Sequence, residues 1–116
     1  MFSILIPTLN NFKYLKLSIE SIKKTSSLNN ELLVHVNEDQ ENVVRNYLKS
    51  INISFTYSEK NIGLCSAINL IARKATKDYL IYSHDDMYFC PNWEGPLKKE
   101  IDNLDHNKFY FSGSMI

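Results

Sequence analysis

Two adjacent carboxylates, Asp85 and Asp86, come just after a mostly apolar segment that ends at Ser83, with His84 between that segment and the pair. Adjacent carboxylates repel each other and are costly to bury unpaired, and a divalent cation removes that conflict. Oxygen ligands on a short turn suit Mg²⁺ or Mn²⁺, with water and a substrate phosphate completing the coordination shell. A solvated turn, or one carboxylate capping a following helix, explains the same pair without a metal.

Other polar segments also follow apolar runs. Asn37 and Glu38 come after an apolar run at residues 32–36, where an amide or carboxylate can bond to a nucleobase N–H or a ribose hydroxyl. Gly63 precedes a helical pattern and would let the backbone approach a ligand closely. Both segments also fit ordinary turns. Neither a GxxxxGK[ST] nor a GxGxxG phosphate-binding motif is present.

The spacing of apolar residues predicts strands that alternate with helices. We expect strands at residues 2–6 (stopped by Pro7), 32–36, 51–57 and 78–83, with a fifth beginning at 109–111, and helices at 12–22, 43–48, 64–75 and 97–104. This alternation predicts one α/β domain over residues 1–116, a three-layer α/β/α arrangement around a mainly parallel sheet. Ligands of such sheets bind at the carboxyl ends of the strands.

The composition excludes several classes of protein. The 116 residues are 44% hydrophobic and 22% charged, which is typical of a globular domain. The net charge is zero, which argues against binding nucleic acid or an anionic membrane through bulk electrostatics. No apolar run approaches the roughly 20 residues of a membrane span. Without a signal peptide or a CxxC motif at Cys65 or Cys90, we expect a cytoplasmic protein.

Four segments in register resemble the family-2 glycosyltransferases, which have the Rossmann-like GT-A nucleotide-diphospho-sugar transferase fold. The first is similar to the family's opening strand and its Pro-Thr-x-Asn turn, and the second to the next strand with its acidic turn. The third is similar to an Asn-x-Gly…Ala-x-Asn stretch, and the fourth to the DxD-type strand and its sequel. The segments are residues 3–10, 31–38, 61–69, and 78–87 with Pro91 and Trp93.

The resemblance implies a site for a nucleotide-diphospho-sugar and for Mn²⁺ or Mg²⁺. Asn37 stands where the family usually has an Asp facing the base, and His84 where many members carry another acid. Asp85 would meet the ribose or diphosphate, and Asp86 the metal. The expected nucleotide-sugar-binding residues are Pro7, Thr8, Leu9, Asn37, Glu38, Gly63, Asn69 and Asp85, and the expected metal ligands are Asp86 and Asp85.

The family's catalytic domain continues well past the fifth strand, and its second half carries the acceptor site and the general base. Neither has a counterpart here, so the resemblance implies the truncated donor-binding half of an inverting, metal-dependent transferase acting on a hydroxyl acceptor. No catalytic residue is assigned in this chain. The alternative is a non-catalytic nucleotide-binding or scaffold module of the same fold. The last strand would lack a covering helix, which predicts self-association through that strand.

Overall fold

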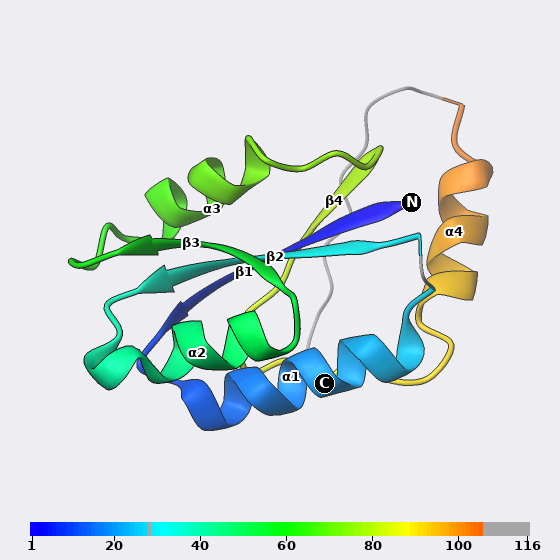
Figure 1. The fold of residues 1–116 in the computed structure, drawn as a ribbon. Helices are drawn as coiled ribbons and strands as arrows, with labels where there is room; N and C mark the ends of the chain where they lie inside the picture. Colours follow the sequence, from blue (N-terminus) through cyan, green and yellow to red (C-terminus); the bar gives the residue numbers. More distant parts are fainter. Residues whose placement is uncertain (28, 106–116) are drawn as a thin grey trace.

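A computed structural model describes residues 1–27 and 29–105 and places strands and helices in alternation (Figure 1). The strands of this part form a four-stranded parallel sheet in the order β3-β2-β1-β4, which confirms the α/β class. The strands are β1 (Phe2–Leu9), β2 (Glu31–Asn37), β3 (Ser54–Ser58) and β4 (Tyr79–Tyr82). The helices are α1 (Phe12–Thr25), α2 (Val43–Ser50), α3 (Leu64–Ala72) and α4 (Glu94–Asp102), with a 3₁₀ turn at Gln40–Asn42.

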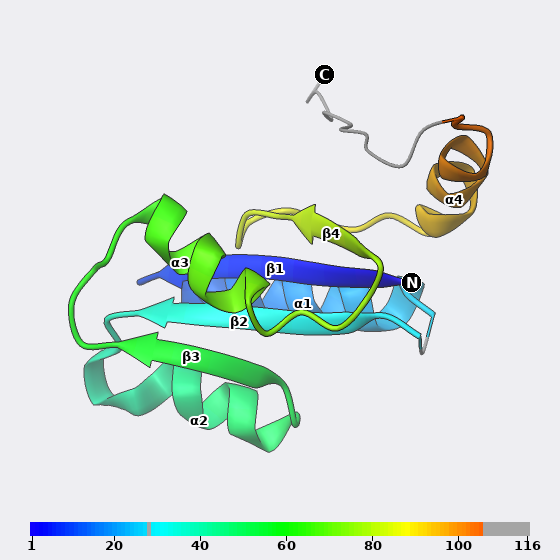
Figure 2. The ribbon, with the colours of Figure 1, turned by 90° about the horizontal axis from the view of Figure 1, so that it is seen from above.

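Helices cover both faces of the sheet, as Figures 1 and 2 show: α1 and α2 lie on one face and α3 on the other. The alternation of side chains along β1 explains this, because successive residues point to opposite faces. Ile4 and Ile6 belong to the larger apolar cluster, which includes residues of α1 and α2, whereas Leu5 packs with Ile71 of α3. The two faces of β1 therefore pack against different helix layers, which gives the three-layer arrangement.

Helix α4 packs near the amino ends of the strands and against the end of α1 (Figure 1). The indole of Trp93, just before α4, lies 5.8 Å from the Phe2 ring, measured between ring centroids. Its Nε1 donates a hydrogen bond to Thr25 Oγ1 at 3.0 Å. The helix therefore lies at the opposite end of the sheet from the carboxyl ends of the strands.

Strand β1 continues through Pro7 to Leu9, so the prediction that Pro7 stops the strand is wrong. The backbones of Met1 and Leu5 face β4, since their carbonyls accept from Tyr79 N and Ser83 N. Pro7 lies two residues further and faces the same side, but the pairing of β4 with β1 ends at Leu5 and Tyr82. The missing N–H of proline therefore removes no hydrogen bond from the sheet.

Two other boundaries differ from the expected ones. Strand β3 begins at Ser54 rather than residue 51, because the preceding residues close α2: Ile53 N donates to Leu48 O at 3.0 Å, and Asn52 has a φ of 57°. Helix α3 ends at Ala72 rather than near residue 75. The next hydrogen bonds, Lys74 N to Ile71 O and Ala75 N to Ala72 O, have the tighter 3₁₀ spacing.

The expected fifth strand at residues 109–111 lies outside the described residues, and so does the self-association predicted from it. None of the helices in the described part of the chain has the length and apolar character needed to cross a bilayer.

Candidate functional site

The sheet has a topological switch point between β1 and β4. The chain proceeds from β1 to β2 to β3 in one direction and then returns to the other side of β1 as β4. Ligands of open parallel sheets bind at such a reversal, outside the carboxyl ends of the strands. The segments that follow β1 and β4 are therefore the first place to look for a site.

Three side chains join β1 to β4 at this point, and we call Thr8, Asn11 and Asp85 the switch-point cluster. Thr8 Oγ1 donates to Asp85 Oδ2 at 2.8 Å, and Asn11 Nδ2 donates to Asp85 Oδ1 at 2.9 Å. Thr8 is buried and Asp85 is half-buried. Both oxygens of one carboxylate are thus held in fixed directions. The prediction that Asp85 lies at the same edge as Thr8 is confirmed.

The sequence offers Asn11 as a cap residue for the following helix, within the segment 7–11 that follows the first expected strand. It occupies the N-cap position of α1, but its side chain makes no capping hydrogen bond and bonds to Asp85 instead. Asparagine at an N-cap usually accepts a hydrogen bond from the first turn of the helix. The side chain of Asn11 is therefore committed to the switch-point cluster. Its position directly after the first strand is the sequence signal that could have identified it.

Asp86, next to the switch-point cluster, is exposed and has no hydrogen bond or ion pair to the described residues. Within residues 1–27 and 29–105, no three His, Cys, Asp or Glu side chains gather closely enough to hold a metal ion. The residues present still fit two ligands of a hard cation. Asp86 offers a free carboxylate, and each oxygen of Asp85 keeps a lone pair beyond its one hydrogen bond. His84 is exposed and its ring contacts Tyr82.

Asn37 ends β2 beside Leu9 of β1 and is 4% exposed. Its Oδ1 accepts hydrogen bonds from Ile62 N at 3.0 Å and Ser58 Oγ at 3.1 Å. Behind it, the buried His35 contacts Ser58 Oγ through Nε2 at 3.0 Å and Thr56 Oγ1 through Nδ1 at 2.6 Å. Burial lowers the pKa of His35, and the side chain of Asn37 offsets that effect only in part. The imidazole is therefore neutral at pH 7. His35 is therefore a hydrogen-bonded interior residue.

The other expected binding residues lie at or near the same edge. Leu9 is exposed at the end of β1, and Glu38 has a φ of 51° with its N–H bonded to Ser58 O at 2.9 Å. Gly63 has a φ of 83°, a conformation that favours glycine, and it precedes α3. Asn69 is exposed on α3, six residues beyond Gly63. Asn69 thus lies more than one helical turn beyond Gly63, further along α3.

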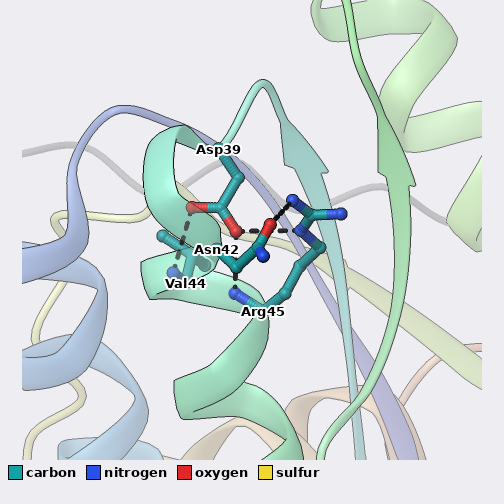
Figure 3. A network of polar contacts seen from close by, with 4 residues as sticks. All are labelled: Asp39, Asn42, Val44 and Arg45. Atoms are coloured by element: carbon teal, nitrogen blue, oxygen red, sulfur yellow. Dashed lines mark hydrogen bonds and ion pairs between the residues drawn. The ribbon is translucent and has the colours of Figure 1, made fainter.

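A second polar network fixes the start of α2 and was not expected from the sequence (Figure 3). The carboxylate of Asp39 accepts hydrogen bonds from Val44 N at 3.1 Å and from Arg45 N and Nε, both at 3.0 Å. The guanidinium of Arg45 also bonds to Asn42 Oδ1 and lies 3.7 Å from the centroid of the Tyr57 ring. A hollow of about 340 Å³ opens beside Asp39. Its walls are Asn10, Phe12, Asp39, Gln40, Val43 and Val44.

We expect Asp39→Ala to lower the free energy of unfolding by about 1–2 kcal/mol at pH 7, as for loss of a helix cap. Burial acts to raise the pKa of Asp39, but the N–H donors and the Arg45 charge outweigh it and hold that pKa below its usual value. This stability is present above the usual Asp pKa of about 3.9 and is lost as the pH falls through the lower folded value. Urea unfolding at pH 7 and pH 2.5 measures the effect.

The difference between the wild type and Asp39→Ala should shrink at pH 2.5. Glu59→Ala, at an exposed position, is the matched control and should change stability by less than about 0.5 kcal/mol. An Asp39→Ala effect of equal size at both pH values would show that the carboxylate charge contributes nothing.

Comparison with known sequences gives one family and two curated relatives. Residues 3–112 match the family described as Glycosyl transferase family 2. The Bacillus subtilis protein "Uncharacterized glycosyltransferase YwdF" is 30% identical over 105 residues, which is 89% of this chain and 39% of that protein. A Haemophilus influenzae protein described as an uncharacterized glycosyltransferase is 29% identical over 91 residues, covering 78% of this chain and 31% of that protein.

Solved structures share the fold at lower sequence identity. S. aureus TarS 1-349 superposes with a TM-score of 0.76 and 20% identity over 87% of this chain and 32% of that one. The same protein has been solved in complex with UDP-GlcNAc. The mannosyltransferase PcManGT from Pyrobaculum calidifontis, in complex with GDP-Man and Mn²⁺, has a TM-score of 0.62 and 18% identity over 76% of this chain and 28% of that one. The chain thus spans well under half of each similar protein.

Proposed function

The chain belongs to glycosyl transferase family 2 and has the GT-A-like fold of its structural neighbours, and from that premise we propose that it binds a nucleotide-diphospho-sugar donor. The observation that carries the proposal is the switch-point cluster. Thr8 and Asn11 orient the Asp85 carboxylate at the sheet reversal, and Asp86 stands beside it. The chain covers only 39% and 31% of its curated relatives, so sugar transfer is proposed for the whole protein.

The order of the strands supports an order for the parts of the donor. Asp85 follows β4, Thr8 belongs to β1 and Asn37 ends β2, so the three residues lie at or just beyond the carboxyl ends of three adjacent strands. Neighbouring strands lie about 4.8 Å apart, so this row spans about 10 Å. That length suits a nucleoside diphosphate lying across the strand ends. The base would meet Asn37 and Glu38, the nucleoside would lie along Pro7, Thr8 and Leu9, and the ribose or diphosphate would meet Asp85.

Asp86, with Asp85, would hold Mn²⁺ or Mg²⁺ next to the diphosphate. A cation there supplies positive charge that stabilises the diphosphate as it leaves. The structure of PcManGT contains Mn²⁺ together with GDP-Man, which is in keeping with this assignment. Gly63 would let the backbone before α3 approach the ligand, and Asn69 would contribute from α3. In the whole protein, a hydroxyl acceptor would attack the anomeric carbon with inversion, activated by a base outside the residues assigned here.

Isothermal titration of the 116-residue chain with nucleoside diphosphates, in Mn²⁺ and in a chelator, tests the proposal. We expect binding in Mn²⁺ and much weaker binding in the chelator, because the diphosphate and the two carboxylates share the ligation of the ion. Equal binding in both conditions would favour the alternative, a nucleotide-binding module that uses no metal. No binding to any nucleoside diphosphate in either condition would contradict the donor site.

A further inference from the structure

The amide of Asn37 has a single orientation, and the backbone of Ile62 determines it. A backbone N–H can only donate a hydrogen bond, so the Asn37 atom 3.0 Å from Ile62 N must be the oxygen. The same oxygen accepts from Ser58 Oγ at 3.1 Å. A rotation of the amide by 180° would place an NH₂ group against the Ile62 N–H, with no acceptor between them.

The residues behind Asn37 reinforce this orientation. The single hydroxyl hydrogen of Ser58 goes to Asn37 Oδ1, so Ser58 Oγ must accept from His35 Nε2. His35 then carries its proton on Nε2, and the unprotonated Nδ1 accepts from the hydroxyl of Thr56. Every hydrogen in the series from Thr56 to Asn37 therefore points in one direction. The oxygen of Asn37 is held by two donors from within the protein.

The other end of the amide, Nδ2, makes no hydrogen bond within the described part of the protein. In that part, the fully buried polar atoms without a partner are Ser18 Oγ and Ser26 Oγ. Asn37 is only 4% exposed as a whole and ends β2 next to Leu9 of β1, so the unbonded Nδ2 is the part of its side chain that is left for a ligand at this edge. What Asn37 presents at the edge of the sheet is a donor, while its acceptor is already used.

We propose that Asn37 selects a nucleobase whose ring nitrogen facing Nδ2 carries a lone pair, and that it discriminates against a ring N–H at that position. This inference rests on the proposed function, since it takes the base to lie at the end of β2. Cytosine and uracil are matched in size and differ in this respect: cytosine N3 carries a lone pair, whereas uracil N3 carries a hydrogen. Two facing donors leave both unpaired, and an unpaired polar group in a contact is costly.

Binding of CDP and UDP in Mn²⁺ to the wild type and to Asn37→Asp tests the inference. Aspartate keeps the shape of asparagine, and one of its oxygens can still accept from Ile62 N–H and Ser58. Its second oxygen replaces the donor with an acceptor. We expect the wild type to bind CDP more tightly than UDP, and the CDP-to-UDP ratio of affinities to fall by about tenfold or more in Asn37→Asp.

The ratio is the informative quantity, because the added negative charge weakens both diphosphates alike. Asn46→Asp, which adds the same charge at an exposed position of α2, should leave the ratio unchanged. A wild type that prefers UDP, or a ratio that Asn37→Asp does not change, overturns the inference and leaves the donor site standing. If neither CDP nor UDP binds the wild type, the proposed function itself fails. If Asn37→Asp does not fold, the wild-type preference alone decides.

Discussion

Replacing Asp86 with asparagine should remove most of the effect of Mn²⁺ on nucleoside diphosphate binding. Metal and nucleotide raise each other's affinity by the same factor, and couplings of this kind are typically about 5- to 150-fold. Asp86 is the exposed, unpaired carboxylate in the described part of the site, so of the two proposed ligands it is the one more free to hold the ion. Titration of the nucleotide in Mn²⁺ and in a chelator should give a ratio of affinities below about twofold for Asp86→Asn.

Two further variants make this result specific. Asp85→Asn should reduce the coupling less, because the Asp85 oxygens are already bonded to Thr8 and Asn11 and its proposed partner is the ribose or diphosphate. Asp78→Asn makes the same charge change at an exposed position on the amino side of β4 and should leave the coupling unchanged. Retention of the full Mn²⁺ effect in Asp86→Asn would contradict the metal assignment.

Ile4→Ala should lower the free energy of unfolding by about 2–5 kcal/mol, which is a large part of the stability of a single domain. Ile4 is fully buried on β1, which pairs with both β2 and β4. Truncation leaves a cavity between the sheet and α1 that the neighbouring strands cannot close. Ile4→Ala leaves the side chain of Thr8, on the same strand, unchanged. Nucleotide binding should therefore weaken only under conditions in which the variant begins to unfold. Urea denaturation followed by circular dichroism measures the loss.

The size of the Ile4 effect has internal controls. Ile4→Val removes one methylene group and should cost about 0.5–1.5 kcal/mol. Leu17→Ala removes the side chain of a residue that is 49% exposed on α1, and its effect should stay within about 0.5 kcal/mol. Equal losses for Ile4→Ala and Leu17→Ala would contradict the burial of β1 between two helix layers.

The order of elements and the shared edge of the site could be predicted from the sequence. Strand patterns that alternate with helix patterns along the sequence indicate a parallel sheet. In a parallel sheet, the residues that follow the strands lie at one edge. That reasoning predicts that Asp85 lies near Thr8, although they are 77 positions apart in the sequence, and their hydrogen bond confirms it. The continuation of β1 through Pro7 could not be predicted in the same way. It depends on how far β4 extends along β1, which local sequence does not encode.

The roles of Asn11 and Asn37 also depend on distant partners. Asparagine is common at helix N-caps, so the type of Asn11 does not distinguish a cap from a partner of Asp85, 74 positions away. The amide of Asn37 can donate or accept, and the choice is made by Ile62, 25 positions away. Their positions after strands therefore predicted that both residues lie at the edge where ligands bind, while the direction of each hydrogen bond required the fold.

Paramagnetic broadening by Mn²⁺ tests the central claim most directly, because the claim is that donor and metal bind at the carboxyl edge of the sheet. Amide NMR signals of the isotope-labelled chain would be recorded with a nucleoside diphosphate before and after adding Mn²⁺. We expect the strongest broadening at residues 8–11 and 84–87, and sharp signals at Glu31 and Thr76, which bond to each other at the amino edge. Strong broadening at Glu31 and Thr76, with sharp signals at Asp85 and Asp86, would contradict the account.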